Sequence, residues 1–294
     1  MEYGSAVLLE SARHGYYLDR LVETAKRTAW TVQKQICKGD FVPAGFETTF
    51  SVGEKVRLIG KIDRYDIYDD DEVRAIRVID YKSGTKNFDL TEVYYGLSLQ
   101  LVVYLESVAQ REGQKHPDKR IVKAGMFYYH MQDPVLEDGG KDPEALENKL
   151  ISQLKLEGLS NSDREVIHWM DHLVGEEPQI LPVKIKKDGD FGAGSSVASS
   201  DQLDQLGYFV KRRIEKLADG WMSGEISKNP FLYAKDSQRK TACEFCRFAS
   251  VCRFDERRKD CAYHRLIHLD EENVWQRVYE EVKDEWEKTG QKNS

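Results

Sequence analysis

The sequence predicts an α/β domain, and three patterns support this prediction. Apolar residues recur at helical spacing across residues 11–38. Across residues 46–81, apolar and polar residues alternate with a period of two, which is typical of strands with one buried face. A second amphipathic helix, which carries Gln100, is expected further along, with a buried stripe formed by Leu97, Leu101 and Leu105. We expect Asp89 to cap this helix and the helix to end before Gly113. Long helices around several strands indicate a layered α/β fold.

The rest of the chain continues this alternation of helices and short strands. We expect strands at residues 124–129 and 180–185, and helices at 144–156, 162–173, 201–223 and 270–288. The last helix places Val274, Val278 and Val282 four residues apart, and we expect this stripe to pack on its own domain rather than on a partner. We expect residues 1–240 to form the core and residues 241–294 a cysteine-containing loop and C-terminal helix.

Composition and charge limit the class of protein. The 294 residues are 40% hydrophobic and 32% charged, as in soluble globular proteins. The net charge of −7 argues against a domain that holds nucleic acid by bulk electrostatics. No apolar run reaches the roughly 20 residues of a membrane span, and no signal peptide is evident. We therefore expect a cytoplasmic protein without membrane contact.

The acidic and basic residues of the segment from Gly60 to Lys82 indicate a catalytic site. In a strand over residues 79–84, Asp80 and Lys82 share one face and Tyr81 points to the other. Asp63 lies in the preceding strand pattern, and a polar turn at residues 69–72 allows a hairpin that places both acids at one end.

Two neighbouring carboxylates can hold a divalent cation while leaving a position open for a phosphate. Lys82 beside them could orient or deprotonate a water and stabilise charge in the transition state. The pattern therefore favours metal-assisted phosphodiester hydrolysis. The alternative is that Asp80 and Lys82 are ordinary residues at a strand end, followed by a Ser83-Gly84 turn.

Three short patterns resemble the motifs of RecB-type nucleases in the PD-(D/E)xK superfamily. They are Gly-Lys-Ile-Asp ending at Asp63, Asp-Tyr-Lys at residues 80–82, and Gln-x-x-x-Tyr from Gln100 to Tyr104. Over nearly the whole chain, the sequence is similar to the C-terminal nuclease domain of the AddB family. Members of that family belong to bacterial helicase-nucleases and work with an AddA-type subunit.

The resemblance implies a fold, a reaction and a set of site residues. The fold would be restriction-endonuclease-like, with a mixed central sheet flanked by helices. The reaction would be exonucleolytic hydrolysis of single-stranded DNA at the end of a strand, in double-strand-break repair by recombination. Asp63, Asp80 and the Tyr81 carbonyl would hold Mg²⁺ or Mn²⁺, and Lys82 would serve the water. Gln100 and Tyr104, four apart on one helix face, would position DNA or brace the site.

Some parts of the family pattern are not found in this sequence. No Walker A pattern occurs, so any ATP-driven translocation would belong to another part of the assembly. RecB-type nucleases commonly take a metal ligand from a His on an upstream helix, and we expect this chain to begin after that helix. A competing hypothesis follows: a catalytically incomplete domain that guides DNA or acts as a scaffold.

Three cysteines, Cys243, Cys246 and Cys252, lie within ten positions of one another. Together with a fourth ligand they could complete a zinc site or a [4Fe-4S] cluster, and their spacing does not distinguish the two. They could also be buried free thiols, and a zinc-bound interaction module is a further alternative. The resemblance implies an iron-sulfur cluster.

The fourth ligand of that cluster would be a cysteine upstream of the nuclease core. Cys37 does not match its position, whereas Cys261 could substitute for it. We expect this chain to hold the cluster poorly or not at all.

Overall fold

The computed structural model describes residues 11–290 apart from 54, 85, 133, 135–141, 173–177, 236–237 and 260. Packing divides the chain into two compact units. Unit 1 comprises Met1–Val52, Ile59–Phe88 and Leu101–Asp204, and unit 2 comprises Gly53–Leu58, Asp89–Gln100 and Gln205–Ser294. The division into packing units differs from the domain boundary that we expect at residue 240. That boundary stays a prediction, because packing units need not be folding domains.

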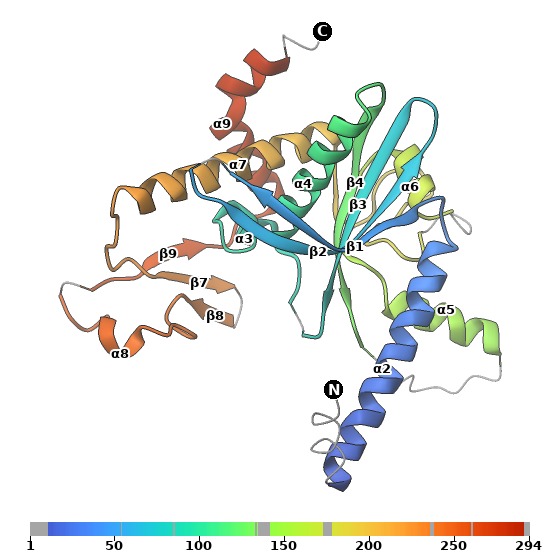
Figure 1. Ribbon diagram of the computed structural model, residues 1–294, viewed down its shortest axis with the longest axis horizontal. Coiled ribbons are helices and arrows are strands. Elements are labelled where there is room, and N and C mark those ends of the chain that lie inside the picture. Colours follow the sequence, from blue (N-terminus) through green and yellow to red (C-terminus); the bar gives the residue numbers. More distant parts are fainter. Residues whose placement is uncertain are drawn as a thin grey trace. The chain divides into compact units, whose positions relative to one another are not determined.

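Unit 1 is built on a mixed six-stranded sheet with the strand order β1-β2-β3-β4-β5-β6 (Figure 1). β2 and β3 are antiparallel, β3 and β4 parallel, β4 and β5 antiparallel, and β5 and β6 parallel. The strands are β1 (Val42–Val52), β2 (Leu58–Asp69), β3 (Val73–Lys82), β4 (Arg120–His130), β5 (Glu157–Asn161) and β6 (Val197–Ala198). The helices along this part of the chain are α2 (Ala12–Ile36), α4 (Gln100–Lys115), α5 (Pro143–Gln153) and α6 (Arg164–Met170). The expected mixed sheet with flanking helices is confirmed.

The hairpin between β2 and β3 forms as the sequence predicts. The Asp70 carboxylate accepts hydrogen bonds from the backbone N–H groups of Glu72 and Val73, at 2.9 and 2.6 Å, and so closes the turn. The two strands then pair from Asp69 with Arg74 to Arg64 with Ile79. This register fixes which acidic residues meet at the far end of the hairpin.

A helix must separate the parallel strands β3 and β4, because parallel neighbours need a long crossover. α4 is that crossover, and its Leu101, Leu105 and Val108 are buried. The helix runs to Lys115, so the expectation that it ends before Gly113 is wrong. A single residue without a side chain does not stop a helix whose neighbours are held by packing.

The sequence predicts that Asp89 caps the helix that carries Gln100, but Asp89 caps a different helix. Its carboxylate accepts from the N–H groups of Thr91 and Glu92, at the start of the short helix α3 (Leu90–Tyr94). Gly96, at φ +81°, follows α3 in a left-handed conformation that favours glycine and ends helices. Leu97 therefore lies between α3 and α4 and is not part of the α4 stripe.

The core of unit 1 packs between the sheet and its helices, and includes Ile79, Phe127, Tyr129, Leu154, Ile167 and Met170. Residues 180–185 contribute Ile180, Leu181 and Val183 to this core. They do not form the expected strand, but an irregular segment with a bridge between Ile185 and Phe191. Pro182 has no N–H group to donate to a strand neighbour.

Unit 2 contains a second sheet that the sequence did not predict. Its strands are β7 (Phe231–Lys235), β8 (Gln238–Thr241) and β9 (His264–Ile267), in the order β8-β7-β9. Its helices are α3, most of α7 (Ser200–Met222), α8 (Ala249–Cys252) and α9 (Glu271–Gly290). The valine stripe of α9 is buried, and α9 packs against α3. This packing confirms that the stripe docks on its own unit.

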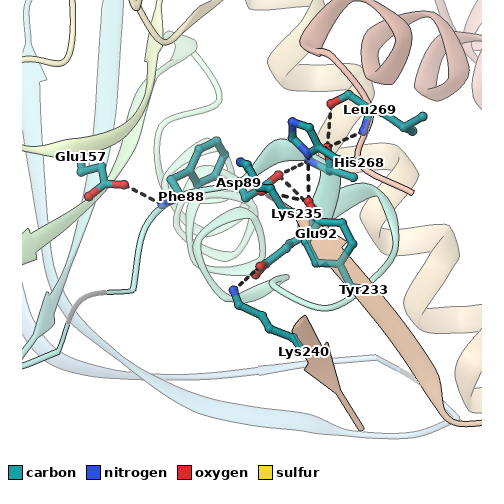
Figure 2. A network of polar contacts seen from close by, with 10 residues as sticks. Phe88, Asp89, Glu92, Glu157, Tyr233, Lys235, Lys240, His268 and Leu269 are labelled. Atoms are coloured by element: carbon teal, nitrogen blue, oxygen red, sulfur yellow. Dashed lines mark hydrogen bonds and ion pairs between the residues drawn. The ribbon is translucent and has the colours of Figure 1, made fainter. Parts of the chain in front are cut away.

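Unit 2 also holds a closed polar network around Asp89 (Figure 2). The Asp89 carboxylate accepts from the Tyr233 hydroxyl at 3.1 Å and from Lys235 Nζ at 2.8 Å. His268 Nδ1 lies 2.9 Å from the same hydroxyl, and Thr91 Oγ1 donates to the Leu269 carbonyl at 2.9 Å. The network ties α3 to β7 and to the segment after β9.

None of the helices described in the structure is both long enough and apolar enough to cross a membrane.

Candidate active site

Two carboxylates meet where the β2-β3 hairpin opens, as the sequence predicts. The Asp63 carboxylate accepts a 2.8 Å hydrogen bond from the backbone N–H of Tyr81, which places it beside Asp80. Asp80 is 2% exposed. Burial raises the pKa of the Asp80 carboxyl, the neighbouring Lys82 ammonium opposes this, and the charge of Asp63 adds to the rise.

Lys82 lies on the same face as Asp80, as period-two alternation requires. Its Nζ is 2.5 Å from Asp80 Oδ2, and it stands 5.3 Å from the centre of the Tyr128 ring. A buried carboxylate and an ammonium within hydrogen-bonding distance form a charged pair that can hold a water or a phosphate oxygen next to both groups.

Strand register extends this face across the sheet. Asp80 pairs with Tyr128, and Tyr128 pairs with Glu157 on β5. Two residues further along these strands, Lys82 pairs with His130. Paired residues on neighbouring strands point to the same face. The face that carries Asp80 therefore also carries Tyr128, Glu157 and His130.

Aromatic packing explains why the Gly-Lys-Ile-Asp motif begins with a glycine, Gly60. A Cβ atom on Gly60 would lie 2.6 Å from the Phe50 ring, which is closer than real Cβ contacts. Phe50 in turn packs edge-on against Tyr104, with ring centres 5.5 Å apart. Tyr104 is 7% exposed and so belongs to the core beside the first motif.

Gln100 is the first residue of α4 and is counted with unit 2, whereas Tyr104 belongs to unit 1. The spacing of four on one helix is confirmed. The role of Gln100 at the site stays a prediction.

The opposite face of the same hairpin buries a separate cluster of charges. Both Asp66 oxygens accept from the Arg64 guanidinium at 2.6 Å, and Arg77 Nε donates to Asp66 Oδ2 at 2.9 Å. All three side chains are at most 1% exposed. Arg77 also donates to the Met170 carbonyl. Arginine and carboxylate satisfy one another here, so this cluster is structural.

The donor set at Asp63 and Asp80 fits a hard divalent cation. Two carboxylates and the Tyr81 carbonyl offer oxygen ligands from adjacent strands. The raised pKa of Asp80 marks a buried negative charge that its protein neighbours only partly balance. A bound cation would relieve that imbalance.

Sequence reasoning missed three side chains of this region: Lys86, His130 and Glu157. His130 Nε2 lies 2.9 Å from Glu157 Oε2, and His130 Nδ1 lies 2.8 Å from the Gly84 carbonyl. Lys86 Nζ stands 5.6 Å from the centre of the Tyr128 ring. The alternation in β4 puts Tyr128 and His130 on one face, and this signal could have identified His130. No pattern in the sequence near Glu157 or near Gly84 indicates that His130 contacts both of them.

The cysteines of the expected cluster lie in unit 2. Cys243 is partly buried, Cys246 and Cys252 are exposed, and Cys261 is buried with its Sγ 3.8 Å from Lys228 Nζ. In the part of the chain that the structure describes, no three His, Cys, Asp or Glu side chains are grouped as a metal site. These residues do not fit a cluster as they stand, and the iron-sulfur assignment stays a prediction.

Comparisons with known proteins point to one family. The model of the PD-(D/E)XK nuclease superfamily matches residues 2–253. A protein of Thermoanaerobacter sp. (strain X514), named as a subunit of an ATP-dependent helicase/deoxyribonuclease, is 33% identical over 96% of this chain and 25% of its own length. Proteins of the same name from Alkaliphilus metalliredigens and Lachnoclostridium phytofermentans are 32% and 34% identical, over 95% of this chain and 25% and 24% of their own lengths.

This chain thus spans about a quarter of the length of the curated relatives that it matches. The family match, together with the mixed sheet, confirms the restriction-endonuclease-like fold.

Proposed function

The chain belongs to the PD-(D/E)XK nuclease superfamily, and from that premise we propose that it hydrolyses phosphodiester bonds of single-stranded DNA with Mg²⁺ or Mn²⁺. The observation that carries this proposal is the grouping of Asp63, Asp80 and Lys82 at the open end of one hairpin. Two acids and a lysine in this arrangement match what metal-assisted hydrolysis requires.

The residues of the site would have separate roles in this reaction. Asp63, Asp80 and the Tyr81 carbonyl would hold the cation, which when bound polarises the phosphate and the attacking water. The Tyr81 N–H holds one oxygen of Asp63, and the other oxygen would bind the cation. Lys82 would orient the water and stabilise the charge that develops on the phosphate oxygens. Gln100 and Tyr104 would brace this arrangement or position the strand.

The names of the relatives support a role for this chain within a larger assembly. Each relative is named as one subunit of a helicase/deoxyribonuclease, which implies an assembly with at least one other subunit. We propose that this chain supplies the exonuclease activity of such an assembly, on the end of a strand, beside an AddA-type subunit, in recombinational repair of DNA. Bacterial DNA lies in the cytoplasm, and so would this activity.

Cleavage of end-labelled single-stranded DNA in Mg²⁺ or Mn²⁺ tests the proposal. We expect Asp80→Ala and Lys82→Ala each to lower kcat/KM about 10³-fold or more, because each removes charge stabilisation at the reacting phosphate. Asp71→Ala, an exposed acid in the turn of the same hairpin, is the matched control and should cleave like the wild type.

Thermal unfolding followed by circular dichroism would establish that the variants are folded. Unchanged cleavage by both Asp80→Ala and Lys82→Ala would overturn the assignment of the site. Binding of DNA by the wild type without any cleavage would instead support a domain that guides DNA.

A further inference from the structure

The loop after Lys82 brings a second lysine to the ring that Lys82 contacts. We propose that Lys86 is a further DNA-phosphate contact of this site, and that the pair His130 and Glu157 positions the loop that carries it. The inference rests on the proposed nuclease function and assigns new residues to the same site.

Lys86 lies close enough to act on the same group as Lys82. The two ammonium groups stand 5.6 and 5.3 Å from the centre of the Tyr128 ring, which is itself paired with Asp80 in the sheet. Both lysines therefore lie beside a ring whose strand position faces the same side of the sheet as Asp80.

The loop that bears Lys86 is held at several points. The Lys82 carbonyl accepts from the Met131 N–H at 2.9 Å, and the Gly84 carbonyl lies 2.8 Å from His130 Nδ1. Beyond Lys86, the Phe88 N–H donates to Glu157 Oε1 at 2.8 Å, as Figure 2 shows. These bonds hold Lys82 and Gly84, which precede Lys86, and Phe88, which follows it.

His130 and Glu157 contact each other, and each also contacts the loop on one side of Lys86. We call this pair the clamp. His130 Nε2 contacts Glu157 Oε2 at 2.9 Å, and both partners of the His130 ring are oxygen acceptors. The Glu157 carboxylate is therefore held by the His130 ring and by the Phe88 N–H.

The chemistry of this corner suits a phosphodiester backbone. Lys86 is exposed and its ammonium lies over an aromatic ring, so it can meet a phosphate in water without a large loss of hydration. A DNA strand that places one phosphate at Asp80 and Lys82 would present another phosphate nearby. A lysine fixed at this point would bind that phosphate as a point charge.

The first test measures cleavage of labelled single-stranded DNA at several NaCl concentrations. We expect Lys86→Ala to raise KM about five- to tenfold with kcat within about twofold, and to reduce the slope of log KM against log salt by about 0.7, the value for one phosphate contact on a single strand. Lys86→Arg should retain most of the wild-type KM. Lys26→Ala, which removes an exposed lysine from α2, is the control and should change neither KM nor the salt slope.

The second test addresses the clamp. Glu157→Gln keeps an acceptor for the Phe88 N–H and removes the carboxylate that binds His130. We expect it to raise KM and lower the salt slope as Lys86→Ala does, and the double variant to be no worse than Lys86→Ala alone. A KM and a salt slope that stay at wild-type values in Lys86→Ala would overturn the inference. Additive effects in the double variant would overturn the role of the clamp.

Equilibrium binding of fluorescent single-stranded DNA in Ca²⁺ separates this inference from the proposed function. If the wild type binds but does not cleave in Mg²⁺ or Mn²⁺, the proposed hydrolysis fails. A five- to tenfold weaker Kd of Lys86→Ala in the same assay would still support the phosphate contact. Equal Kd values would overturn it.

Discussion

The two faces of the β2-β3 hairpin carry charged clusters of opposite kinds. On one face, Arg64, Asp66 and Arg77 are buried and bonded to one another at 2.6 to 2.9 Å. On the other face, Asp80 is equally buried, but its neighbours include the half-buried Lys82 and a second acid, Asp63. The same two strands therefore hold one carboxylate with both oxygens bonded to arginines and one carboxylate that lies beside a second carboxylate. With respect to the carboxylate alone, we call the first cluster balanced and the second unbalanced.

The difference shows how a single hairpin supports both stability and chemistry. A buried carboxylate whose oxygens are all bonded to guanidinium groups holds its strands in register, and its removal leaves arginine charges uncompensated. A buried carboxylate beside another carboxylate has a raised pKa and an unfavourable charge, which a bound cation can relieve. The balanced cluster holds β2 and β3 in register, and this register sets the positions of Asp63 and Asp80 in the unbalanced cluster.

The largest expected effect tests the balanced cluster. Asp66→Ala should lower the free energy of unfolding by about 3–5 kcal/mol, because Arg64 and Arg77 would remain buried without their carboxylate. Urea denaturation followed by circular dichroism measures the change. A cost below about 1 kcal/mol would remove the contrast between the two faces.

A smaller effect is expected at the glycine of the first motif. Gly60→Ala should cost about 1–3 kcal/mol, because the new Cβ would meet the Phe50 ring at 2.6 Å. Combining it with Phe50→Leu should recover part of that loss, since the smaller side chain leaves room. If the double variant is less stable than the sum of the two single costs predicts, the close approach is not the cause.

A third cluster, in unit 2, is also balanced and extends the comparison to pH. Burial favours the neutral form of Asp89, but the hydrogen bond and charge of Lys235 outweigh it and lower the pKa of Asp89 from 3.8. A lowered pKa in the folded state means that the stabilisation is present above pH 3.8 and is lost as pH falls through the folded pKa.

Asp89→Asn should therefore reduce stability by about 1 kcal/mol at pH 7, and the difference from the wild type should shrink below about pH 4. Urea denaturation of both proteins from pH 2.5 to 7 measures this difference. A constant difference across that range would show that the charge of Asp89 is not the source.

The smallest effect on stability is expected at the unbalanced cluster. Asp80→Asn should change the free energy of unfolding by no more than about 1 kcal/mol, and can raise it, because it removes a buried charge next to Asp63. Parallel urea curves for Asp80→Asn and Asp66→Ala make the comparison direct. A loss at Asp80 as large as that at Asp66 would mean that Asp80 is structural.

The local features of the site could be predicted from the sequence. Alternation put Asp80 and Lys82 on one face, and the polar turn predicted a hairpin that brings Asp63 beside Asp80. These inferences depend on periodicity and on turn chemistry, which act over a few residues. The helix expected at residues 11–38 is likewise close to the observed α2, which Ser11 caps.

Other features could not be predicted because they depend on contacts between distant residues. Glu157 meets Phe88 across 69 positions, and its pairing with Tyr128 follows from the register of β4 and β5. The sequence also joined Asp89 to the wrong helix, since a helix-capping residue does not reveal how far its helix runs.

The strands of the hairpin, the grouping of Asp63, Asp80 and Lys82 at its end and the family could all be inferred from the sequence alone. The tertiary structure decided which side chains share the face of Asp80, because strand register and loop closure depend on packing over the whole core. It also separated Asp66, whose oxygens are bonded to two arginines, from Asp80, which lies beside a second carboxylate. A charge is structural or chemical according to the partners that surround it, and those partners come together only in the folded chain.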